Sequence, residues 1–230
     1  MTGNHAEASD DGSGAVDDAA GAVDGGTAAA NADDVDDVTD LYTEYADERL
    51  PPGQRRTDRF PVLSKSGTPS SDPSTYDLEV WGAVENSLSY SLAAFRDLPS
   101  VTQRQDFHCV TGWSKFDCRF TGVPFSEIVE RADVDDDAEH VVFHARDGYT
   151  TDLPLADCTR DEVLFAYAYD GDDLPADHGG PLRVVTPHKY AYKGAKWVSG
   201  VEFLTHTELG YWEKRGYSDA ANPWNEERYS

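Results

Sequence analysis

Positively charged residues are scarce in this chain of 230 residues, which has 19 lysines and arginines against 44 aspartates and glutamates. The formal net charge of −25 repels nucleic acids and anionic membranes, so we expect neither as a partner. Dense surface carboxylates also keep a protein hydrated in concentrated salt. We therefore interpret the acidic composition as a halophilic adaptation, which concerns the environment of the protein and not its activity.

Cysteine and long hydrophobic runs are scarce as well. The three cysteines, Cys109, Cys118 and Cys158, form no CxxC pair and show no zinc-ligand spacing, and their odd number argues against a disulfide framework. No run of about 18 apolar residues is present, so no membrane span is expected. The N-terminus lacks the basic and apolar regions of a secretory signal, and we therefore expect a cytoplasmic protein.

The first 40 residues contain no aromatic side chain and consist mainly of Asp, Ala and Gly. Such a segment buries too little apolar surface to offset the entropy of ordering it. We predict a disordered acidic tail over 1–40 and a single domain over 41–230. Neither βαβ alternation nor a glycine-rich fingerprint is visible, which disfavours a Rossmann domain or a P-loop.

Hydrophobic alternation predicts several short strands and few helices within the domain. Ser91 is the expected N-cap of a short helix over 91–97, and a second helix is expected over 124–131. The aromatic C-terminal stretch is expected to pack back over the core. This pattern favours an α+β fold with mixed β-sheets and short helices. The predicted strands are 76–81, 101–109, 116–120, 141–143, 149–153, 163–169, 182–186 and 197–204.

Cys109 is the most suggestive of the three cysteines, because it ends a predicted strand just before a glycine turn, in the segment FHCVTGWS. A strand end aims one side chain rigidly, and a thiolate is a good ligand for a transition metal. The alternatives are a buried structural cysteine and a nucleophile paired with a base. His108 is a poor base for Cys109, since adjacent strand residues face opposite sides.

The stretch HGGPLRVVTPHKYAYKGAKWVSGV at 178–201 contains no acidic residue, although the chain is otherwise rich in them. It carries Arg183, Lys189, Lys193 and Lys196 together with glycines that let a ligand approach the backbone. Cations beside exposed amides indicate an anion site, and a small phosphorylated molecule is the expected ligand. The alternative is a basic strip that pairs with the carboxylates of the protein itself.

The segments DFHCVTGWS, LPADHGGPLRVVTP and YKGAKWVSGVEF, in this order, resemble the sulfite-oxidase-like molybdopterin-dependent oxidoreductases. The resemblance runs from about residue 53 to 230. It implies a sulfite-oxidase-type molybdopterin-binding domain and the molybdenum cofactor, Mo-molybdopterin. It further implies oxygen-atom transfer to or from a small substrate, such as a sulfur compound, with a separate electron carrier.

The resemblance also assigns roles to individual residues. Cys109 matches the molybdenum ligand, and Tyr167 matches an active-site tyrosine; these two are the expected catalytic residues. The segment 145–147 falls near a further cofactor contact. The expected cofactor-binding residues are Thr57, Phe60, His108, His178, Arg183, Gly194, Ala195 and Lys196.

The sequence departs from sulfite oxidases in two places. Thr111-Gly112-Trp113-Ser114 replaces a Gly-Asn-Arg-Arg run. Residues 51–75, rich in Pro, Gly and Ser, are expected to form an extended arm, and Thr57 stands where the arm's substrate-binding arginine is expected. Because a sulfite pocket needs fixed positive charge, the resemblance does not predict sulfite as the substrate. No dimerisation domain is recognised, so a monomer is expected. A redox-inactive anion-binding protein with the same fold and a cysteine-nucleophile enzyme stay open as alternatives.

Overall fold

The computed structural model describes residues 38–40, 48–70 and 72–230. The predicted acidic tail lies outside these residues over 1–37. Its last three positions form strand β1 (Val38–Asp40), which pairs in parallel with β5, so the described structure begins inside the predicted tail. None of the described helices has the length and apolar character needed to span a bilayer.

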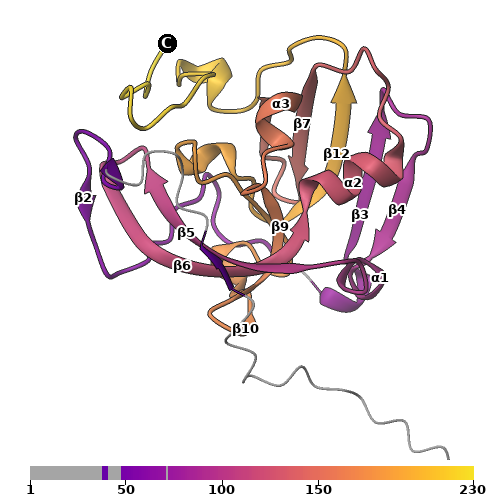
Figure 1. The fold of residues 1–230 in the computed structure, drawn as a ribbon, viewed down its shortest axis with the longest axis horizontal. Coiled ribbons are helices and arrows are strands. Elements are labelled where there is room, and N and C mark those ends of the chain that lie inside the picture. Colours follow the sequence, from indigo (N-terminus) through magenta and orange to yellow (C-terminus); the bar gives the residue numbers. More distant parts are fainter. Residues whose placement is uncertain (1–37, 41–47, 71) are drawn as a thin grey trace, which may run out of the picture. The chain divides into compact units, whose positions relative to one another are not determined.

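The described strands form two mixed sheets, as the sequence predicted (Figure 1). The first sheet has the order β1-β5-β6-β9-β10, with β2 beside β6 and β11 beside β9; the second has the order β4-β3-β12-β7-β8. Besides β1, the first sheet contains β2 (Arg55–Arg56), β5 (Val101–Cys109), β6 (Trp113–Pro124), β9 (Leu164–Tyr169), β10 (Asp172–Asp173) and β11 (Arg183–Val185). The second contains β3 (Asp77–Gly82), β4 (Leu88–Ser91), β7 (His140–Ala145), β8 (Thr150–Pro154) and β12 (Val198–Leu204).

The helices are short, and α1 and α2 lie where the sequence predicted helices. Ser91 caps α1 (Leu92–Arg96) by accepting a hydrogen bond from the backbone of Ala94, 3.2 Å away. Helix α2 (Phe125–Ala132) follows Pro124 and buries Phe125 and Ile128 completely, each worth roughly 1.5–3 kcal/mol. The other short helices are α3 (Leu155–Cys158) and the 3-10 helices η3 (Pro73–Thr75), η4 (Ala176–His178), η5 (Ala191–Lys193) and η6 (Glu213–Arg215).

Two hydrophobic clusters hold the sheets together. The larger includes Phe125, Phe143 and Phe165, whose rings pack with centroids 5.6–6.1 Å apart. The smaller lies on the first sheet and contains Phe107 and Cys109. Cys109 therefore belongs to a packed region of β5 and is not on a free loop.

A tight hairpin fixes the position of Cys109. Strands β5 and β6 pair antiparallel up to Cys109 and Trp113, and the backbone of Gly112 donates a hydrogen bond to the Cys109 carbonyl at 3.0 Å. Gly112 has φ +91°, which glycine adopts without strain. The predicted glycine turn thus places the thiol at the end of a rigid ladder.

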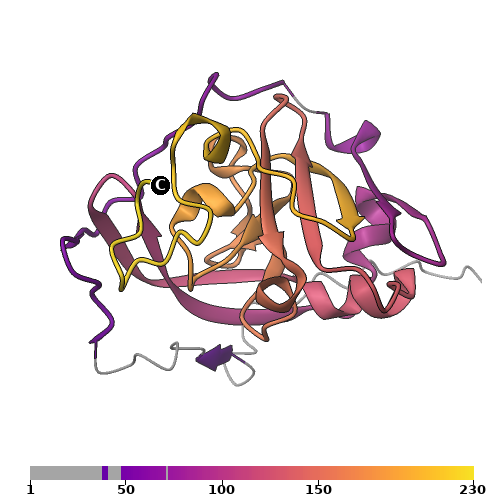
Figure 2. The same ribbon diagram turned by 90° about the horizontal axis from the view of Figure 1, so that it is seen from above.

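The C-terminal segment lies over the loops that follow β11, drawn in yellow over orange in Figures 1 and 2. The backbone of Tyr190 donates to the Ala221 carbonyl at 2.8 Å, and Lys189 Nζ donates to the Ala220 carbonyl at 3.0 Å. The predicted packing of this aromatic stretch over the core is confirmed, and Tyr211 and Trp212 contact the larger cluster.

Candidate active site

A cavity of about 220 Å³ brings together several of the predicted site residues. Its wall contains Cys109 and Thr111 from the β5–β6 hairpin, and His178, Arg183 and Lys196 from the acid-free stretch. Further wall residues include Phe60, Lys65, Asp147, Tyr149, Tyr192, Gly194, Trp212 and Tyr217. Residues far apart in sequence, predicted to serve one cofactor, thus share one cavity.

The Cys109 thiol borders this cavity in a mostly apolar setting. Its side chain is nearly buried, and Thr111 Oγ1 lies 3.2 Å from its Sγ atom. Burial raises the pKa of the Cys109 thiol above its usual range, with the Thr111 hydrogen bond opposing the shift. A thiol in such a place needs a bound cation to be held as a thiolate.

His108 lies on the opposite face of β5 and does not line the cavity, although the sequence analysis placed it among the cofactor contacts. Its Nδ1 atom lies 2.8 Å from Ser114 Oγ, and its ring packs edge-on against Trp224. Burial lowers the pKa of His108 to about 4, so the ring is neutral. Because neighbouring strand residues face opposite sides, His108 cannot serve Cys109 as a base.

Arg183 and Lys196 are the cations that give the cavity its positive end. The Arg183 guanidinium is fully buried, donates to the His178 carbonyl at 2.9 Å and lies 5.1 Å from the Phe107 ring centroid. Lys196 Nζ donates to the Asp177 carbonyl at 2.9 Å. Within the described part of the chain, no carboxylate oxygen lies within 4.0 Å of either cation.

Desolvation affects both of these cations. Burial lowers the pKa of Arg183 to about 10. It lowers the pKa of Lys196 to about 8, and the nearby Arg183 charge adds to this shift. A buried positive charge without a carboxylate partner is unfavourable until an anion arrives. The pair is therefore suited to a phosphate-bearing ligand.

The other two lysines of the acid-free stretch do not contribute to this anion site. Lys189 Nζ pairs with Asp157 at 2.7 Å, and Lys193 Nζ pairs with Glu213 at 2.8 Å. The alternative interpretation, a basic strip neutralised by the protein's own carboxylates, is correct for these two lysines. Pairing thus separates the four cations into two that hold the chain together and two that face the cavity.

Glycines bring the backbone close to the two unpaired cations. A Cβ atom on Gly194 would lie 2.7 Å from the Val184 carbonyl oxygen, so the chain passes too tightly there for any side chain. Gly179 has φ +110°, and its Cβ would lie 3.0 Å from Arg183 Cβ and 3.1 Å from Lys196 Cβ. Ala195 is buried beside Gly194 and accepts a backbone bond from Val184, but its side chain does not line the cavity.

The arm before β3 contributes Phe60 but not Thr57 to the cavity. The Phe60 ring stacks on the His178 ring with centroids 4.1 Å apart. Burial lowers the pKa of His178, which keeps its ring neutral in this stack. Thr57 instead donates its backbone N–H to the Ser114 carbonyl at 2.9 Å, outside the cavity wall.

Tyr167 is also outside the cavity wall, and the structure does not support the catalytic role predicted for it. Its ring lies 5.1 Å from the Arg96 guanidinium and packs against the larger hydrophobic cluster. Its neighbour Ala166 faces the smaller cluster, which contains Cys109. Since side chains alternate along β9, Tyr167 points to the other side of the sheet.

Several aromatic residues of the wall, among them Tyr149, Tyr192, Trp212 and Tyr217, were not predicted as site residues. Tyr149 follows the Asp147-Gly148 turn, Tyr192 lies in η5, and Trp212 and Tyr217 come from the C-terminal segment. Lys65, on the arm, donates to the Asp147 carbonyl at 2.6 Å. Asp147 belongs to the segment 145–147, which the resemblance had placed near the cofactor.

These residues fit a phosphorylated organic ligand that carries a soft metal. The cavity offers one thiol as a metal donor, aromatic rings as its wall, and the buried Arg183 with the half-buried Lys196 as phosphate partners that form no ion pair with a described carboxylate. The model for the oxidoreductase molybdopterin binding domain matches residues 65–212. The chain belongs to this family.

Relatives of this oxidoreductase domain support the same assignment. It is 39% identical over 183 residues to the uncharacterized oxidoreductase YuiH of Bacillus subtilis, covering 79% of this chain and 92% of that protein. It is 33% identical over 147 residues to the putative protein-methionine-sulfoxide reductase subunit YedZ1 of Azospira oryzae, covering 64% and 56%. With human mitochondrial sulfite oxidase it shares 29% over 178 residues, covering 65% of this chain and 33% of the enzyme.

The fold of the domain is also known from a solved structure. The sulfane dehydrogenase SoxCD of Paracoccus pantotrophus superposes with a TM-score of 0.60 at 18% identity, covering 67% of this chain and 44% of that one. The predicted α+β molybdopterin-binding fold is therefore confirmed. The chain is a molybdopterin-dependent oxidoreductase by family, and its cofactor is molybdopterin.

Anion binding by the cofactor-free domain should weaken as Lys196 loses its charge. Sulfate keeps a constant charge and is a suitable probe. Since the pKa of Lys196 is about 8, we expect sulfate affinity to fall about tenfold between about pH 7 and about pH 9, measured by titration calorimetry. Lys196→Met should bind weakly at both pH values, and Lys189→Met should behave like the wild type. Equal sulfate affinity at both pH values in the wild type would contradict this account.

Proposed function

We propose that this protein catalyses oxygen-atom transfer to or from a small substrate, with Cys109 as the protein's ligand to molybdenum. The observation that carries the proposal is the shared cavity, which holds the Cys109 thiol together with the unpaired Arg183 and Lys196. The alternative, an anion-binding protein without redox activity, explains the two cations but does not explain the thiol in the same wall. When bound, the cofactor supplies the two-electron chemistry of oxygen transfer.

The residues of the chain bind and orient this cofactor. Arg183 and Lys196 hold its phosphate by charge-assisted hydrogen bonds, and Gly179 and Gly194 leave room for that approach. Cys109 fixes the metal at the end of a hydrogen-bonded hairpin. The rings of Phe60, Tyr149 and the other wall aromatics keep water out, which strengthens each polar contact inside.

The charges of the cavity favour a neutral substrate over sulfite. Its cationic wall residues are Lys65, Arg183 and Lys196, and Lys65 already pairs with Asp147. With Arg183 and Lys196 engaged by the cofactor phosphate, no unpaired cation of the described wall is left for a dianion. We therefore propose S-oxides or N-oxides as substrates, with electrons supplied by a separate carrier in the cytoplasm.

A substrate screen joined to metal analysis tests this function. The purified protein, expressed in a host that makes the cofactor, should contain molybdenum and reduce S-oxides or N-oxides with a low-potential dye as electron donor. Oxidation of sulfite should be at least about tenfold slower than reduction of the best oxide, because the cavity has no unpaired positive charge left for the sulfite dianion. Molybdenum-loaded protein that turns over sulfite and none of the oxides would contradict the substrate class. Correctly folded protein that never retains molybdenum would contradict the function itself.

A further inference from the structure

Four charged side chains meet behind the aromatic wall of the cavity, outside the residues assigned to the cofactor. Lys193 Nζ lies 2.8 Å from Glu213 Oε1, 2.9 Å from Asp219 Oδ1 and 3.5 Å from Asp152 Oδ1. The side chains of Lys193, Asp152 and Glu213 are completely buried, whereas that of Asp219 is 41% exposed. We call these four residues the Lys193 cluster.

The Lys193 cluster contains more negative charge than its single cation can neutralise. Three carboxylates surround one ammonium group, and two carboxylate oxygens, Asp152 Oδ2 and Glu213 Oε2, are buried without a hydrogen-bond donor. Such oxygens are unfavourable unless a proton reaches them. Burial raises the pKa of Asp152 to about 6; the Lys193 charge opposes this shift, and the charges of Asp219 and Glu213 add to it. Asp152 therefore carries the proton in mildly acidic solution.

Groups from every neighbouring element face the cluster. Tyr149 from the β7–β8 hairpin and Tyr192 from η5 interact electrostatically with Glu213, and the buried thiol of Cys158 in α3 interacts with Asp152 and Lys193. His140 from β7 interacts with Asp219. The charges of Lys189 and Asp157 also act on Cys158. Among the described residues, Lys193 is the only lysine or arginine with its nitrogen within 4.0 Å of the three carboxylates.

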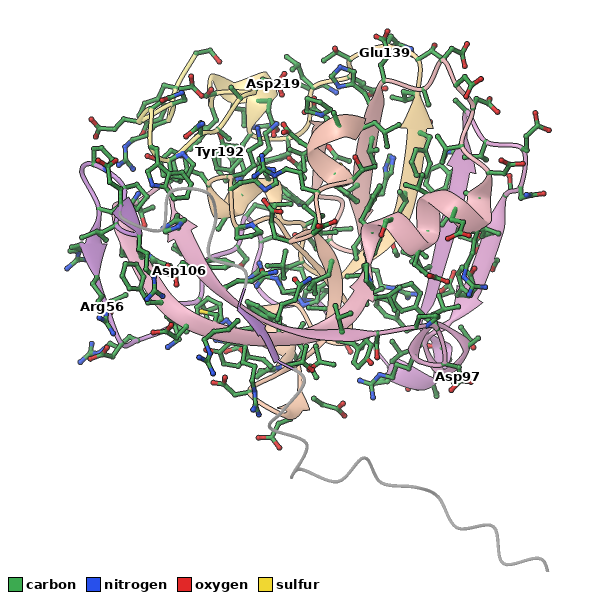
Figure 3. The ribbon with its side chains drawn as sticks, in the orientation of Figure 1. Arg56, Asp97, Asp106, Glu139, Tyr192 and Asp219 are labelled. Carbon is green, nitrogen blue, oxygen red and sulfur yellow. The ribbon has the colours of Figure 1, made fainter. Side chains whose placement is uncertain are left out.

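Each member of the Lys193 cluster is a near neighbour in sequence of an aromatic ring in the cavity wall. Lys193 follows Tyr192, Glu213 follows Trp212, Asp219 comes two residues after Tyr217, and Asp152 comes three after Tyr149. Figure 3 labels Tyr192 and Asp219, which lie on the side of the molecule where the C-terminal segment runs.

Two hydrogen bonds also join strand β8 and helix η5 to the C-terminal segment. Thr151 Oγ1 donates to Glu213 Oε1 at 2.7 Å, and the Tyr192 hydroxyl donates to the Ser218 carbonyl at 2.5 Å. The wall rings and the cluster therefore share the same short stretches of backbone. Within the described residues, the Lys193–Glu213 pair is completely buried, whereas the ion pairs of the C-terminal segment outside the cluster, Lys214–Glu208 and Arg228–Glu226, have exposed carboxylates.

We propose that the residues of the Lys193 cluster are positioning residues for the cavity, which hold four of its aromatic wall rings, those of Tyr149, Tyr192, Trp212 and Tyr217, in place most firmly when Asp152 is protonated. Loss of that proton leaves two uncompensated negative charges beside Lys193 and loosens the C-terminal part of the wall. The proposal concerns the wall itself and holds for whichever ligand fills the cavity.

The direction of the pH dependence follows from Asp152. Its pKa is about 6 in the closed wall and near its ordinary value of 3.8 when the segment opens. The proton therefore stabilises the closed wall below pH 3.8 in full, and this contribution is lost as the pH rises through about 6. With this difference in the pKa of Asp152, we expect the equilibrium constant for opening of the C-terminal segment to increase about tenfold between about pH 5 and about pH 7.5.

Hydrogen exchange of the full-length, cofactor-free protein tests the proposal. Peptides from 208–222, corrected for the intrinsic pH dependence of exchange, should show this tenfold loss of protection between the two pH values. Asp152→Asn keeps the size and a donor but has no proton to lose, so its protection should stay constant. Glu208→Gln, an exposed change in the same segment, should keep the wild-type response.

A second variant covers the case in which Asp152→Asn does not fold. Asp219→Asn removes a partly exposed carboxylate that raises the pKa of Asp152, so the midpoint of opening should move to lower pH. Protection that is independent of pH in the wild type, or a midpoint unchanged in Asp219→Asn, would overturn the proposal. Because no cofactor is present, these outcomes are separate from success or failure of the proposed catalytic function.

Discussion

Replacing Cys109 by serine should lower oxygen-transfer activity by more than about 100-fold. Mutating a residue that only supports a metal ligand lowers activity by up to about 100-fold, and loss of the ligand itself should cost more. Serine keeps the shape of the side chain but offers a hard hydroxyl in place of a soft sulfur. The measurement is the initial rate per molybdenum atom for the oxide that the screen identifies, so that loss of metal and loss of rate are separated.

Cys118→Ser is the matched control for this experiment. Cys118 is completely buried in the same hydrophobic cluster as Cys109 but does not line the cavity. A buried thiol replaced by a hydroxyl lowers stability in both variants, whereas only Cys109→Ser should abolish the chemistry. Equal rates per molybdenum in Cys109→Ser and the wild type would remove Cys109 from the reaction.

The second large effect is expected from Arg183→Met, which should weaken retention of the cofactor by about 10- to 100-fold. A charge-assisted hydrogen bond contributes about 1.5–3 kcal/mol, and Arg183 is the fully buried one of the two unpaired cations. Methionine fills similar space without charge. The measurement is the cofactor content after extended dialysis, read from the fluorescence of the oxidised pterin.

Lys189→Met provides the control for Arg183→Met. It removes a cation from the same acid-free stretch, but one that pairs with Asp157 outside the cavity. Urea unfolding of both cofactor-free variants distinguishes a general loss of stability from a specific loss of ligand binding. Cofactor retention that falls equally in both variants would mean that Arg183 acts through the fold and not through the phosphate.

Local patterns in the sequence were sufficient to predict most of the fold. Strand β5 has the predicted bounds, Val101–Cys109, and the predicted glycine turn ends it. Strand β6 is longer than predicted, Trp113–Pro124 instead of 116–120, because its pairing with β5 and β9 extends the strand at both ends. Strand β4 and helix α3 were missed, since both are short and their stability comes from neighbours.

The site was predictable where a residue type and its neighbours determine the chemistry. Cys109, Phe60, His178, Arg183, Gly194 and Lys196 all line the cavity, and their contacts with the metal and the cofactor stay a prediction. Tyr167 and His108 do not, because alternation along a strand sends adjacent side chains to opposite faces and sequence similarity alone does not fix which face matters.

Local sequence patterns do not show which charged side chains form ion pairs with residues far away in the chain. Lys193 and Lys196 have the same charge and lie three residues apart, yet one meets carboxylates from 152, 213 and 219 and the other faces the cavity. No local pattern distinguishes them, because their partners come from segments that only the tertiary fold brings together. The aromatic wall from the C-terminal segment was unpredictable for the same reason.

The most direct test of the central claim is X-ray absorption at the molybdenum edge, which counts the sulfur atoms bound to the metal. The wild-type protein should show three sulfur ligands, two from the dithiolene of the pterin and one from Cys109, and Cys109→Ser should show two. An unchanged sulfur count in Cys109→Ser, with molybdenum still present, would contradict the assignment of Cys109 as the metal ligand.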